Sequence, residues 1–306
     1  MQVIRDLLQS NLDRETVLTI GAYDGLHLGH QELLQRLMRR AHETERYSAV
    51  VTFDPLPRAV LAPESNAVCL TSIEDKVRLL SEWGLDVLAI LPFTEELART
   101  SARGFVQMLH QHLHMTELWI GWDFALGYRR EGDATALERL GRELGYQLHV
   151  IQPVRDGEAV ISSTQIRHLL SEGRVAEAAE MLGRYHRLRG VVVPGKGVGR
   201  ELGFPTANLR VDQGCAVPAS GVYAVYATVG EERLPAAVNI GFAPTLGRNE
   251  RSVEVHLLEF DGRELYGKVV LVEFVERLRE ERRFPDRQGL RTQIAKDVAR
   301  ARETLT

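Results

Sequence analysis

Short apolar runs alternate with helix-like segments through the N-terminal half of the chain. The runs are rich in strand-forming residues and lie at residues 17–21, 48–53, 86–91, 117–121 and 146–151. After the first run, apolar residues recur at helical spacing, namely Leu33, Leu34, Leu37, Met38 and Ala41. This alternation predicts a Rossmann-like parallel sheet covered by helices, with ligands bound beyond the carboxyl ends of the strands. Helical patterning over residues 164–182 is expected to close this domain.

The pattern changes after residue 185, where helical spacing gives way to glycine-marked short strands. These strands are expected at residues 187–193, 221–230, 233–241, 252–260 and 266–276. Because no helices separate them, they predict an all-β barrel or sandwich. Residues 289–305 carry Leu290, Ile294 and Val298 on one face, which predicts a terminal helix packed on the barrel. We place the domain boundary between residues 183 and 184, giving domains of residues 1–183 and 184–306.

The composition supports two ordinary globular domains. The chain has 306 residues, of which 44% are hydrophobic and 26% charged, so it can bury two cores. A net charge of -4 and the absence of a long basic run favour small anionic ligands over nucleic acids. Cys69 and Cys215 lie far apart and lack the paired spacing of a zinc site. The sequence shows no signal peptide and no membrane-spanning apolar stretch, so we expect a cytoplasmic protein without membrane contact.

The first candidate site is the loop at residues 21–30, GAYDGLHLGH, which joins a predicted strand to a predicted helix. Its glycines allow the backbone to approach a phosphate closely, and the helix N-terminus presents N–H groups to it. His27 and His30 are three residues apart, a spacing that can direct both imidazoles toward the same phosphate oxygens. The alternative is a pair of surface histidines in a glycine-rich turn. The strand-loop-helix context favours the phosphate site.

Three further polar segments accompany this loop. They are FDPLPR at residues 53–58, GWDFALGYRREG at residues 121–132 and ISSTQIR at residues 161–167. Taken singly, each could be a turn, a solvated charged loop or a helix cap. Their joint position at one edge of the predicted sheet favours a nucleotide site, and Arg167 suits a triphosphate tail.

The second candidate site is the segment PGKGVGRELGFPTANL at residues 194–209. It combines three glycines with two basic residues, namely Gly195, Gly197, Gly199, Lys196 and Arg200. The spacing GxxxxGK[ST] is absent, which excludes a P-loop kinase. Thr206 and Asn208 are hard oxygen donors two residues apart, and an extended backbone places both on one face, where they suit Mg²⁺ held with nucleotide phosphates. A solvent-facing glycine turn is the alternative.

A carboxylate is predicted on a strand of the second domain. Alternation within residues 252–260 assigns Val253, Val255 and Leu257 to one face, so Glu254 points to the other. Such a carboxylate can act as general base for a substrate hydroxyl within hydrogen-bond reach. By pattern alone, a solvated Glu on a half-exposed strand is the alternative.

These motifs together resemble a known enzyme family. HLGH at residues 27–30 and ISSTQIR are similar to the HxGH and ISSTxIR motifs of the nucleotidyltransferase superfamily. With FDPLPR and GWDFALGYRREG, the N-terminal half resembles its FMN adenylyltransferase branch. Residues 187–306, with GKGVGRELGFPTANL, VNIGFAPT and SVEVHLLEFDGRELYG, resemble riboflavin kinase. The whole chain is thus similar to the bacterial bifunctional riboflavin kinase/FAD synthetases.

For the N-terminal domain, the resemblance implies an ATP site and an FMN site, with His27 and His30 as catalytic residues at the α-phosphate. The residues implied in ATP binding are Gly21, Tyr23, Asp24, His27, His30, Asp123, Ser163, Thr164 and Arg167. The residues implied in FMN binding are Phe53, Pro55, Pro57 and Phe124. A magnesium ion would bridge the phosphates. The family often has His where this chain has Leu56, so a phosphate contact from that side chain is absent here.

For the C-terminal domain, the resemblance implies a riboflavin kinase barrel with Glu254 as the catalytic base. Mg²⁺ would be held by Thr206 and Asn208. The residues implied in ATP binding are Gly195, Lys196, Gly199, Arg200, Thr206 and Asn208. Arg279 and Asp286 would contact the flavin.

The implied function is a pair of consecutive reactions that use ATP. Riboflavin is phosphorylated to FMN in the C-terminal domain, and FMN is adenylylated to FAD with release of pyrophosphate in the N-terminal domain. One rival hypothesis is a single-activity FMN adenylyltransferase whose barrel binds flavin as a regulator, and the PTAN segment with Glu254 argues against it. A second rival is a non-catalytic flavin carrier, which would leave the HxGH loop unexplained.

Overall fold

In the computed structural model of the chain, residues 1–65, 68–156, 159–195, 197–212, 214–242, 251–282 and 284–306 are described. They form two compact units, Met1–Ser162 and Ser163–Thr306. This division falls before the helical residues 163–182, which the sequence-based boundary at residues 183/184 assigns to the first domain. The limits of the functional domains therefore stay a prediction.

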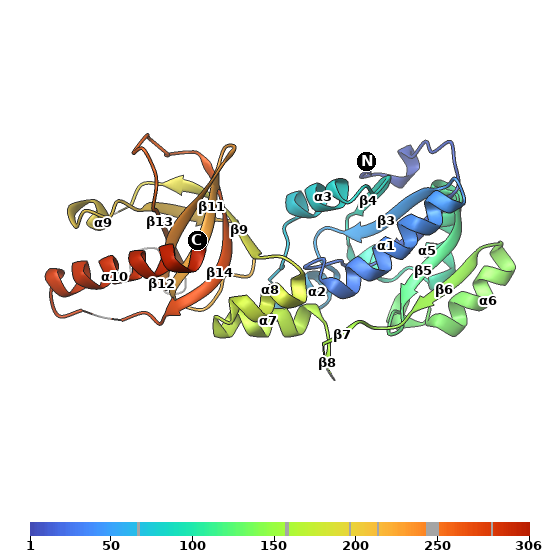
Figure 1. Cartoon of the computed structure of the whole chain (residues 1–306). Helices are drawn as coiled ribbons and strands as arrows, with labels where there is room; N and C mark the ends of the chain where they lie inside the picture. The colour runs from blue at the N-terminus through green and yellow to red at the C-terminus, as the bar shows by residue number, and fades with distance from the viewer. Residues whose placement is uncertain (66–67, 157–158, 196, 213, 243–250, 283) are drawn as a thin grey trace. The chain divides into compact units, whose positions relative to one another are not determined.

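The first unit is built around a six-stranded sheet (Figure 1). Its strands are β1 (Gln2–Ile4), β2 (Thr16–Ile20), β3 (Tyr47–Phe53), β4 (Val87–Leu91), β5 (Met115–Gly121) and β6 (Gln147–Ile151). The order is β1-β4-β3-β2-β5-β6, and every pairing is parallel. The predicted parallel sheet is confirmed. The sequence pattern does not predict the edge strand β1, because its three residues are too few to show a strand pattern.

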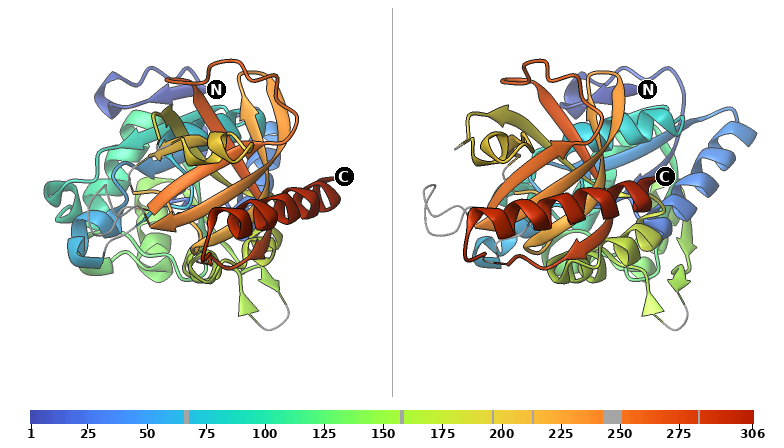
Figure 2. Two further views of the ribbon diagram at one scale, coloured as in Figure 1. Left: turned by 90° about the vertical axis from the view of Figure 1, so that its left-hand side faces the viewer. Right: turned by 60° about the vertical axis from the view of Figure 1, so that its left-hand side comes forward.

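Helices cover both faces of this sheet. They are α1 (Leu28–Glu43), α2 (Pro57–Leu61), α3 (Ile73–Glu82), α4 (Glu95–Ala98), α5 (Ala102–Leu113) and α6 (Ala134–Leu144). Short 3-10 turns η1 (Leu7–Gln9), η2 (Pro63–Ser65) and η3 (Tyr128–Arg130) and a two-stranded ribbon, β7 (Arg155–Asp156) with β8 (Ala159–Val160), complete the unit. Figures 1 and 2 show α1 and α3 on one face of the sheet and α5 and α6 on the other.

Side-chain alternation along the strands explains these layers. On β2, Val17 belongs to the core beneath α1 and α3, whereas its neighbour Leu18 belongs to the core beneath α5 and α6. All five residues of β2 are buried, as expected for a central parallel strand with helices on both sides.

The second unit begins with two helices and continues as a closed barrel. The helices are α7 (Ser163–Glu172) and α8 (Val175–Leu182). The barrel strands are β9 (His186–Val193), β10 (Ala207–Val211), β11 (Gly221–Val229), β12 (Glu232–Phe242), β13 (Arg251–Leu257) and β14 (Val269–Arg279), in the order β10-β13-β12-β11-β14-β9. All pairings are antiparallel. The predicted all-β domain is confirmed, and β10 adds a strand within the PTAN segment.

Helices α7 and α8 are held to the barrel by backbone and arginine contacts. The N–H of Ala219 donates to the carbonyl of Leu170 at 2.9 Å. The guanidinium of Arg277, on β14, donates to the carbonyl of Glu172 at 3.2 Å and to that of Ser220 at 2.6 Å. These contacts explain why α7 belongs to the same compact unit as the barrel.

The terminal helix α10 (Arg287–Leu305) lies against the barrel beside β11 and β12 (Figures 1 and 2). The predicted helix is confirmed and begins two residues earlier than expected. Leu290, Ile294 and Val298 are half-buried, while its fully buried residues are Asp297 and Ala301. Asp297 is buried because it pairs with a barrel arginine, a contact that apolar periodicity does not reveal. A further short helix, α9 (Val198–Glu201), lies in the glycine-rich segment after β9.

Candidate active sites

The first candidate site lies at the carboxyl edge of the parallel sheet. Strand β2 stands between β3 and β5, so the segments that follow these three strands emerge side by side. They are residues 21–30, 54–58 and 122–132. Strands β3 and β4 lie on one side of β2, and strands β5 and β6 lie on the other, so the chain changes sides at β2. Ligands of open parallel sheets bind at such a switch point. The joint placement predicted for the histidine loop, FDPLPR and GWDFALGYRREG is therefore present in the fold, whereas the predicted placement of ISSTQIR beside them stays a prediction.

The loop at residues 21–30 is shaped by a buried tyrosine. Tyr23 is buried, its hydroxyl bonds with that of Thr19, and burial raises the pKa of this phenol. A Cβ at Gly21 would stand 3.0 Å from the Tyr23 ring, so glycine gives the ring its space. Because the ring is directed into the core, a contact of Tyr23 with a nucleotide would come from its backbone.

His27 and His30 are brought together at the start of α1. His27 is the residue that precedes the helix, and the two imidazoles stack with centroids 3.7 Å apart and planes 19° apart. The ring of Tyr23 meets His30 edge-on at 5.0 Å. A Cβ at Gly29 would lie 3.2 Å from the His27 ring, which explains the small residue inside HLGH. The arrangement presents two nitrogen heterocycles at the positive end of a helix dipole.

Asp24 points into the protein from the same loop. It is buried, and its Oδ1 accepts hydrogen bonds from the N–H groups of Leu70 at 2.7 Å and Thr71 at 3.3 Å. The guanidinium of Arg58 stands 3.7 Å from Oδ2. Asp24 therefore ties the loop to residues 70–71, and its predicted place beside the phosphates stays a prediction.

The residues predicted to form an FMN slot follow β3 and β5. Phe53 is buried and meets the ring of Phe93 at 5.3 Å, whereas Phe124 is half-buried against the same core. Pro55 follows a cis peptide bond after Asp54, and Pro57 is the first residue of α2.

Leu56 directly precedes α2 and is half-buried. Asp123 is exposed in the segment after β5, where its backbone carbonyl accepts a hydrogen bond from Arg130 at 2.9 Å. Ser163, Thr164 and Arg167 lie in the first two turns of α7, in the second compact unit. Their meeting with the histidine loop stays a prediction.

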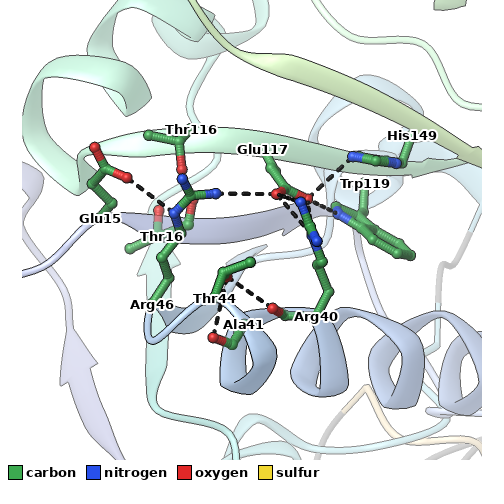
Figure 3. A network of polar contacts seen from close by, with 10 residues as sticks. All are labelled: Glu15, Thr16, Arg40, Ala41, Thr44, Arg46, Thr116, Glu117, Trp119 and His149. Atoms are coloured by element: carbon green, nitrogen blue, oxygen red, sulfur yellow. Dashed lines mark hydrogen bonds and ion pairs between the residues drawn. The ribbon is translucent and has the colours of Figure 1, made fainter.

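A buried carboxylate that the sequence did not single out anchors the other end of α1 (Figure 3). Glu117, on β5, accepts hydrogen bonds from Arg40 at 2.9 Å, Arg46 at 3.1 Å and Trp119 Nε1 at 3.2 Å. His149 Nε2 lies 3.1 Å from the same carboxylate. Burial alone would raise the pKa of Glu117, but the hydrogen bonds and positive charges around it outweigh burial and hold the pKa below its usual value. This network fixes the helix at whose N-terminal end the two histidines lie.

The second candidate site lies on the barrel, where strand register gathers polar residues. Glu254, on β13, pairs directly with Asn208 on β10 and with Asn239 on β12. Val253 and Val255 are buried, whereas Glu254 is half-buried, as alternation predicts. Two amide side chains therefore flank the carboxylate across three neighbouring strands. The sequence pattern does not single out Asn239, because nothing local to VNIG indicates which residue it will face.

Close backbone contacts shape the glycine-rich segment of this site. A Cβ at Gly195 would stand only 2.0 Å from Nδ2 of Asn208, and one at Gly199 would stand 2.4 Å from the carbonyl oxygen of Phe204 and 3.1 Å from Thr206 Oγ1. Glycine is thus required at both positions to hold Thr206 and Asn208 in place. Arg200 is exposed on α9, and Lys196 lies outside the described residues.

The two residues predicted to bind flavin in the barrel have structural partners. Arg279 donates to both oxygens of Asp297, at 2.9 Å from Nε to Oδ1 and 2.7 Å from its terminal nitrogen to Oδ2. Asp286 precedes α10 and its Oδ1 accepts the N–H of Gly289 at 2.7 Å, an N-cap. The Arg279–Asp297 pair attaches α10 to the barrel, whereas Asp286 caps the helix. The predicted flavin contacts of Arg279 and Asp286 stay predictions.

Two family comparisons cover almost the whole chain. The family model described as FAD synthetase matches residues 9–165, and the one described as riboflavin kinase matches residues 182–305. The first match includes strands β2 to β6 of the sheet, and the second includes all the barrel strands, β9 to β14. No helix among the described residues has both the length and the apolar character needed to span a membrane.

Individual relatives give the same result. A bifunctional riboflavin kinase/FMN adenylyltransferase from Escherichia coli strain K12 is 37% identical over 289 residues, or 94% of this chain and 92% of the relative. A protein of the same name from Pseudomonas fluorescens is 38% identical over 305 residues, covering 99% and 97%. A crystal structure described as a macrolide-efflux protein from Streptococcus pneumoniae matches 98% of each chain with a TM-score of 0.90 at 28% identity. The chain therefore belongs to the family of bifunctional riboflavin kinase/FMN adenylyltransferases, with a FAD synthetase domain followed by a riboflavin kinase domain.

Proposed function

We propose that the two reactions of this family take place at the two sites described above. At the barrel, the terminal hydroxyl of riboflavin attacks the γ-phosphorus of ATP, giving FMN and ADP. At the carboxyl edge of the sheet, a phosphate oxygen of FMN attacks the α-phosphorus of a second ATP, giving FAD and pyrophosphate. The FMN made at the first site is thus the substrate of the second.

For the kinase reaction, the pairing of Glu254 with Asn208 and Asn239 carries the proposal. Glu254 accepts the proton of the riboflavin hydroxyl as the new P–O bond forms. Amide groups on either side can orient the hydroxyl and the carboxylate without adding a charge. Gly195, Lys196, Gly199 and Arg200 would surround the phosphates of ATP, and Arg279 and Asp286 would contact the flavin.

Thr206 and Asn208 fit a magnesium ion at the kinase site. Both offer neutral oxygen donors of the kind that Mg²⁺ accepts, and close contacts at Gly199 and Gly195 hold the two side chains. Two protein ligands leave most of an octahedral shell to phosphate oxygens and water, the usual arrangement for Mg²⁺ with a nucleotide. When bound, the ion neutralises charge on the transferred phosphoryl group.

For the adenylyl transfer, the stacked pair His27 and His30 at the start of α1 carries the proposal. Their N–H groups donate to α-phosphate oxygens, whose negative charge grows as the FMN oxygen attacks. The remaining proposed ATP contacts come from Gly21, Tyr23, Asp24, Asp123, Ser163, Thr164 and Arg167. Phe53, Pro55, Pro57 and Phe124 would shape the FMN site.

Labelled ATP tests the assignment of the two phosphorus atoms. With riboflavin as substrate, ATP labelled at the γ-phosphorus should label FMN. With unlabelled FMN as substrate, ATP labelled at the α-phosphorus should label FAD, and γ-labelled ATP should leave FAD unlabelled. Label entering FAD from the γ-position in that second experiment would contradict adenylyl transfer.

Paired variants test the assignment of the two sites. Glu254→Gln keeps the shape of the side chain and should abolish FMN formation while FAD formation from supplied FMN continues. His30→Ala should have the reverse effect, since it removes a donor at the α-phosphate only. A folded single variant that lost both activities would contradict two separate sites. FAD formed from supplied FMN, with no FMN from riboflavin in the wild-type protein, would instead support a regulatory barrel.

A further inference from the structure

A buried lysine lies directly behind the histidine loop. Lys76, on α3, is 2% exposed, and its Nζ donates to the carbonyl oxygen of Ala22 at 2.7 Å and to Oγ1 of Thr52 at 3.1 Å. Thr52 Oγ1 also donates to the Ala22 carbonyl, at 3.1 Å. Two donors from α3 and β3 thus hold a single peptide of the loop.

This contact fixes the direction of the following N–H group. The peptide that joins Ala22 to Tyr23 is planar and trans, so its C=O and N–H point in opposite directions. Because the carbonyl of Ala22 points at Lys76, the N–H of Tyr23 points to the opposite side of the loop. Tyr23 has a φ of 45°, a left-handed backbone conformation that a firm hold on the preceding peptide helps to maintain.

The lysine also brings positive charge into the interior. Among the described residues, the two oxygen atoms that accept hydrogen bonds from Nζ are uncharged. Neither of them neutralises the positive charge of the ammonium. Burial lowers the pKa of Lys76 from 10.5 to about 8, against the attraction of Asp24, Cys69 and Asp54. Arg58 faces Asp24 from α2 and takes up part of that carboxylate's charge. At neutral pH an ammonium therefore stands behind the loop.

A charged lysine buried in this place destabilises the fold unless a nearby negative charge compensates it. An isolated buried ammonium loses its hydration, and an uncharged side chain of similar length would avoid that loss. An anion bound on the outer side of the loop would recover part of this loss through attraction across a low-dielectric interior. Lys76 is also the only lysine among residues 1–162, where Arg is the usual cation.

We propose that Lys76 is a positioning residue for adenylyl transfer, which holds the peptide between Ala22 and Tyr23 and places a positive charge behind the ATP phosphates. This inference rests on the adenylyl transfer proposed for the loop. It assigns to α3, which carries no motif of the reaction, a part in binding the nucleotide. Lys76 acts through the loop and does not touch the reacting atoms.

Two substitutions separate charge from bulk. Lys76→Met removes the charge and the hydrogen bonds while it keeps the length of the side chain, and Lys76→Arg keeps a charge that does not titrate below pH 10. We expect Lys76→Met to slow FAD formation from FMN by roughly 10- to 100-fold at pH 7, the effect of a misplaced phosphate site. Formation of FMN from riboflavin in the same chain should be unchanged. The matched control is Lys296→Met, on the exposed side of α10.

The folding of the variant can be checked in the same unit. All three tryptophans of the chain, Trp83, Trp119 and Trp122, lie in the first compact unit, so their fluorescence reports on that unit alone. Titration of this fluorescence with ATP, without flavin, should show weaker binding in Lys76→Met than in the wild type. This readout does not depend on turnover, so it also distinguishes failure of this inference from failure of the proposed adenylyl transfer.

The pH dependence gives a test that a merely structural lysine would fail. As the pH rises through about 8, wild-type Lys76 loses its proton, so FAD formation should fall relative to Lys76→Arg. Lysine labelled with ¹³C at Cε gives one NMR signal for each of the four lysines, and the signal lost in Lys76→Met should titrate near pH 8. A Lys76→Met protein with native fluorescence, wild-type ATP binding and wild-type FAD formation would overturn the inference. If Lys76→Met does not fold, an identical pH dependence of FAD formation in wild type and Lys76→Arg would overturn it.

Discussion

The two glycine-rich loops proposed to bind phosphates, residues 21–30 and the described part of residues 194–208, are held in place by different means. The first is held by buried charged groups, since its own Asp24 binds the backbone of residues 70–71 and Lys76 of α3 binds the backbone of Ala22. The second rests on close packing, since Gly195 and Gly199 lie against the side chains of Asn208 and Thr206. We therefore expect that a changed pH or a substitution that alters charge affects the first loop. A substitution that enlarges a side chain should affect the second loop.

The largest expected effect concerns the buried carboxylate that anchors α1. Glu117→Ala should destabilise the first unit by about 3 kcal/mol, because it leaves Arg40, Arg46 and the indole N–H of Trp119 without their acceptor. Thermal unfolding followed by tryptophan fluorescence measures this loss. Glu15→Ala is the control, since Glu15 is exposed and its carboxylate pairs with Arg46 at 3.0 Å near the surface, so loss of this carboxylate should matter little.

The pH dependence of the Glu117 contribution follows from the lowered pKa. A carboxyl whose folded pKa lies below its unfolded value stabilises the fold above the unfolded pKa, and this contribution disappears as the pH falls through the folded pKa. The ordinary value is 4.5, so the difference between wild type and Glu117→Ala should be complete at neutral pH and shrink in more acidic solution. A difference that stayed constant down to pH 3 would contradict a charge-based anchor.

The next effect concerns Lys76 and has the same sign with pH as that of Glu117, but it falls in the alkaline range. Its folded pKa of about 8 lies below the unfolded value of 10.5, so between these values the unfolded chain binds more protons and stability rises with pH. From pH 7 to 9.5, the wild type should gain about 2 kcal/mol relative to Lys76→Met, a figure set by the pKa difference. Chemical unfolding of both proteins at the two pH values measures it. Equal shifts in the two proteins would show that Lys76 does not titrate in this range.

Two glycine substitutions compare the loops directly. Gly195→Ala would drive a methyl group into the amide of Asn208, 2.0 Å away, so riboflavin phosphorylation should fall by about 10-fold or more and require more Mg²⁺. Gly21→Ala would press on the Tyr23 ring at 3.0 Å, a milder clash, and should slow only FAD formation. Steady-state rates of both reactions in each variant test this separation. If Gly195→Ala left the kinase reaction unchanged, packing against Asn208 would not be what holds the second loop.

The smallest effect distinguishes a helix cap from a flavin contact. Asp286→Ala should destabilise the second unit by about 1 kcal/mol through loss of the hydrogen bond to Gly289, and Asp286→Ser should restore most of it. If Asp286 also binds flavin, Asp286→Ser should raise the KM for riboflavin while stability is kept. An unchanged KM in the serine variant would limit Asp286 to the cap.

Local sequence patterns determined the architecture and the motif that each loop carries. Apolar runs separated by helical periodicity specify a parallel sheet, because each element needs an apolar face whose period is visible within ten residues. Alternation in residues 252–257 likewise placed Val253 and Val255 inside the barrel and Glu254 outside. Short motifs such as HLGH and PTAN consist of neighbouring residues, so the amino-acid sequence is enough to recognise them.

The tertiary structure alone decided which distant residues meet these motifs. Lys76 contacts a backbone carbonyl 54 positions earlier, and strand register places Asn239 beside Glu254. Arg279 faces Asp297 because α10 packs across the barrel, which gives a predicted flavin contact a structural partner. Nothing within a local window encodes such pairings, since they depend on strand order, register and helix packing. For this protein the sequence therefore determined the architecture and the motif of each loop, and the packed fold decided which groups hold each loop in position.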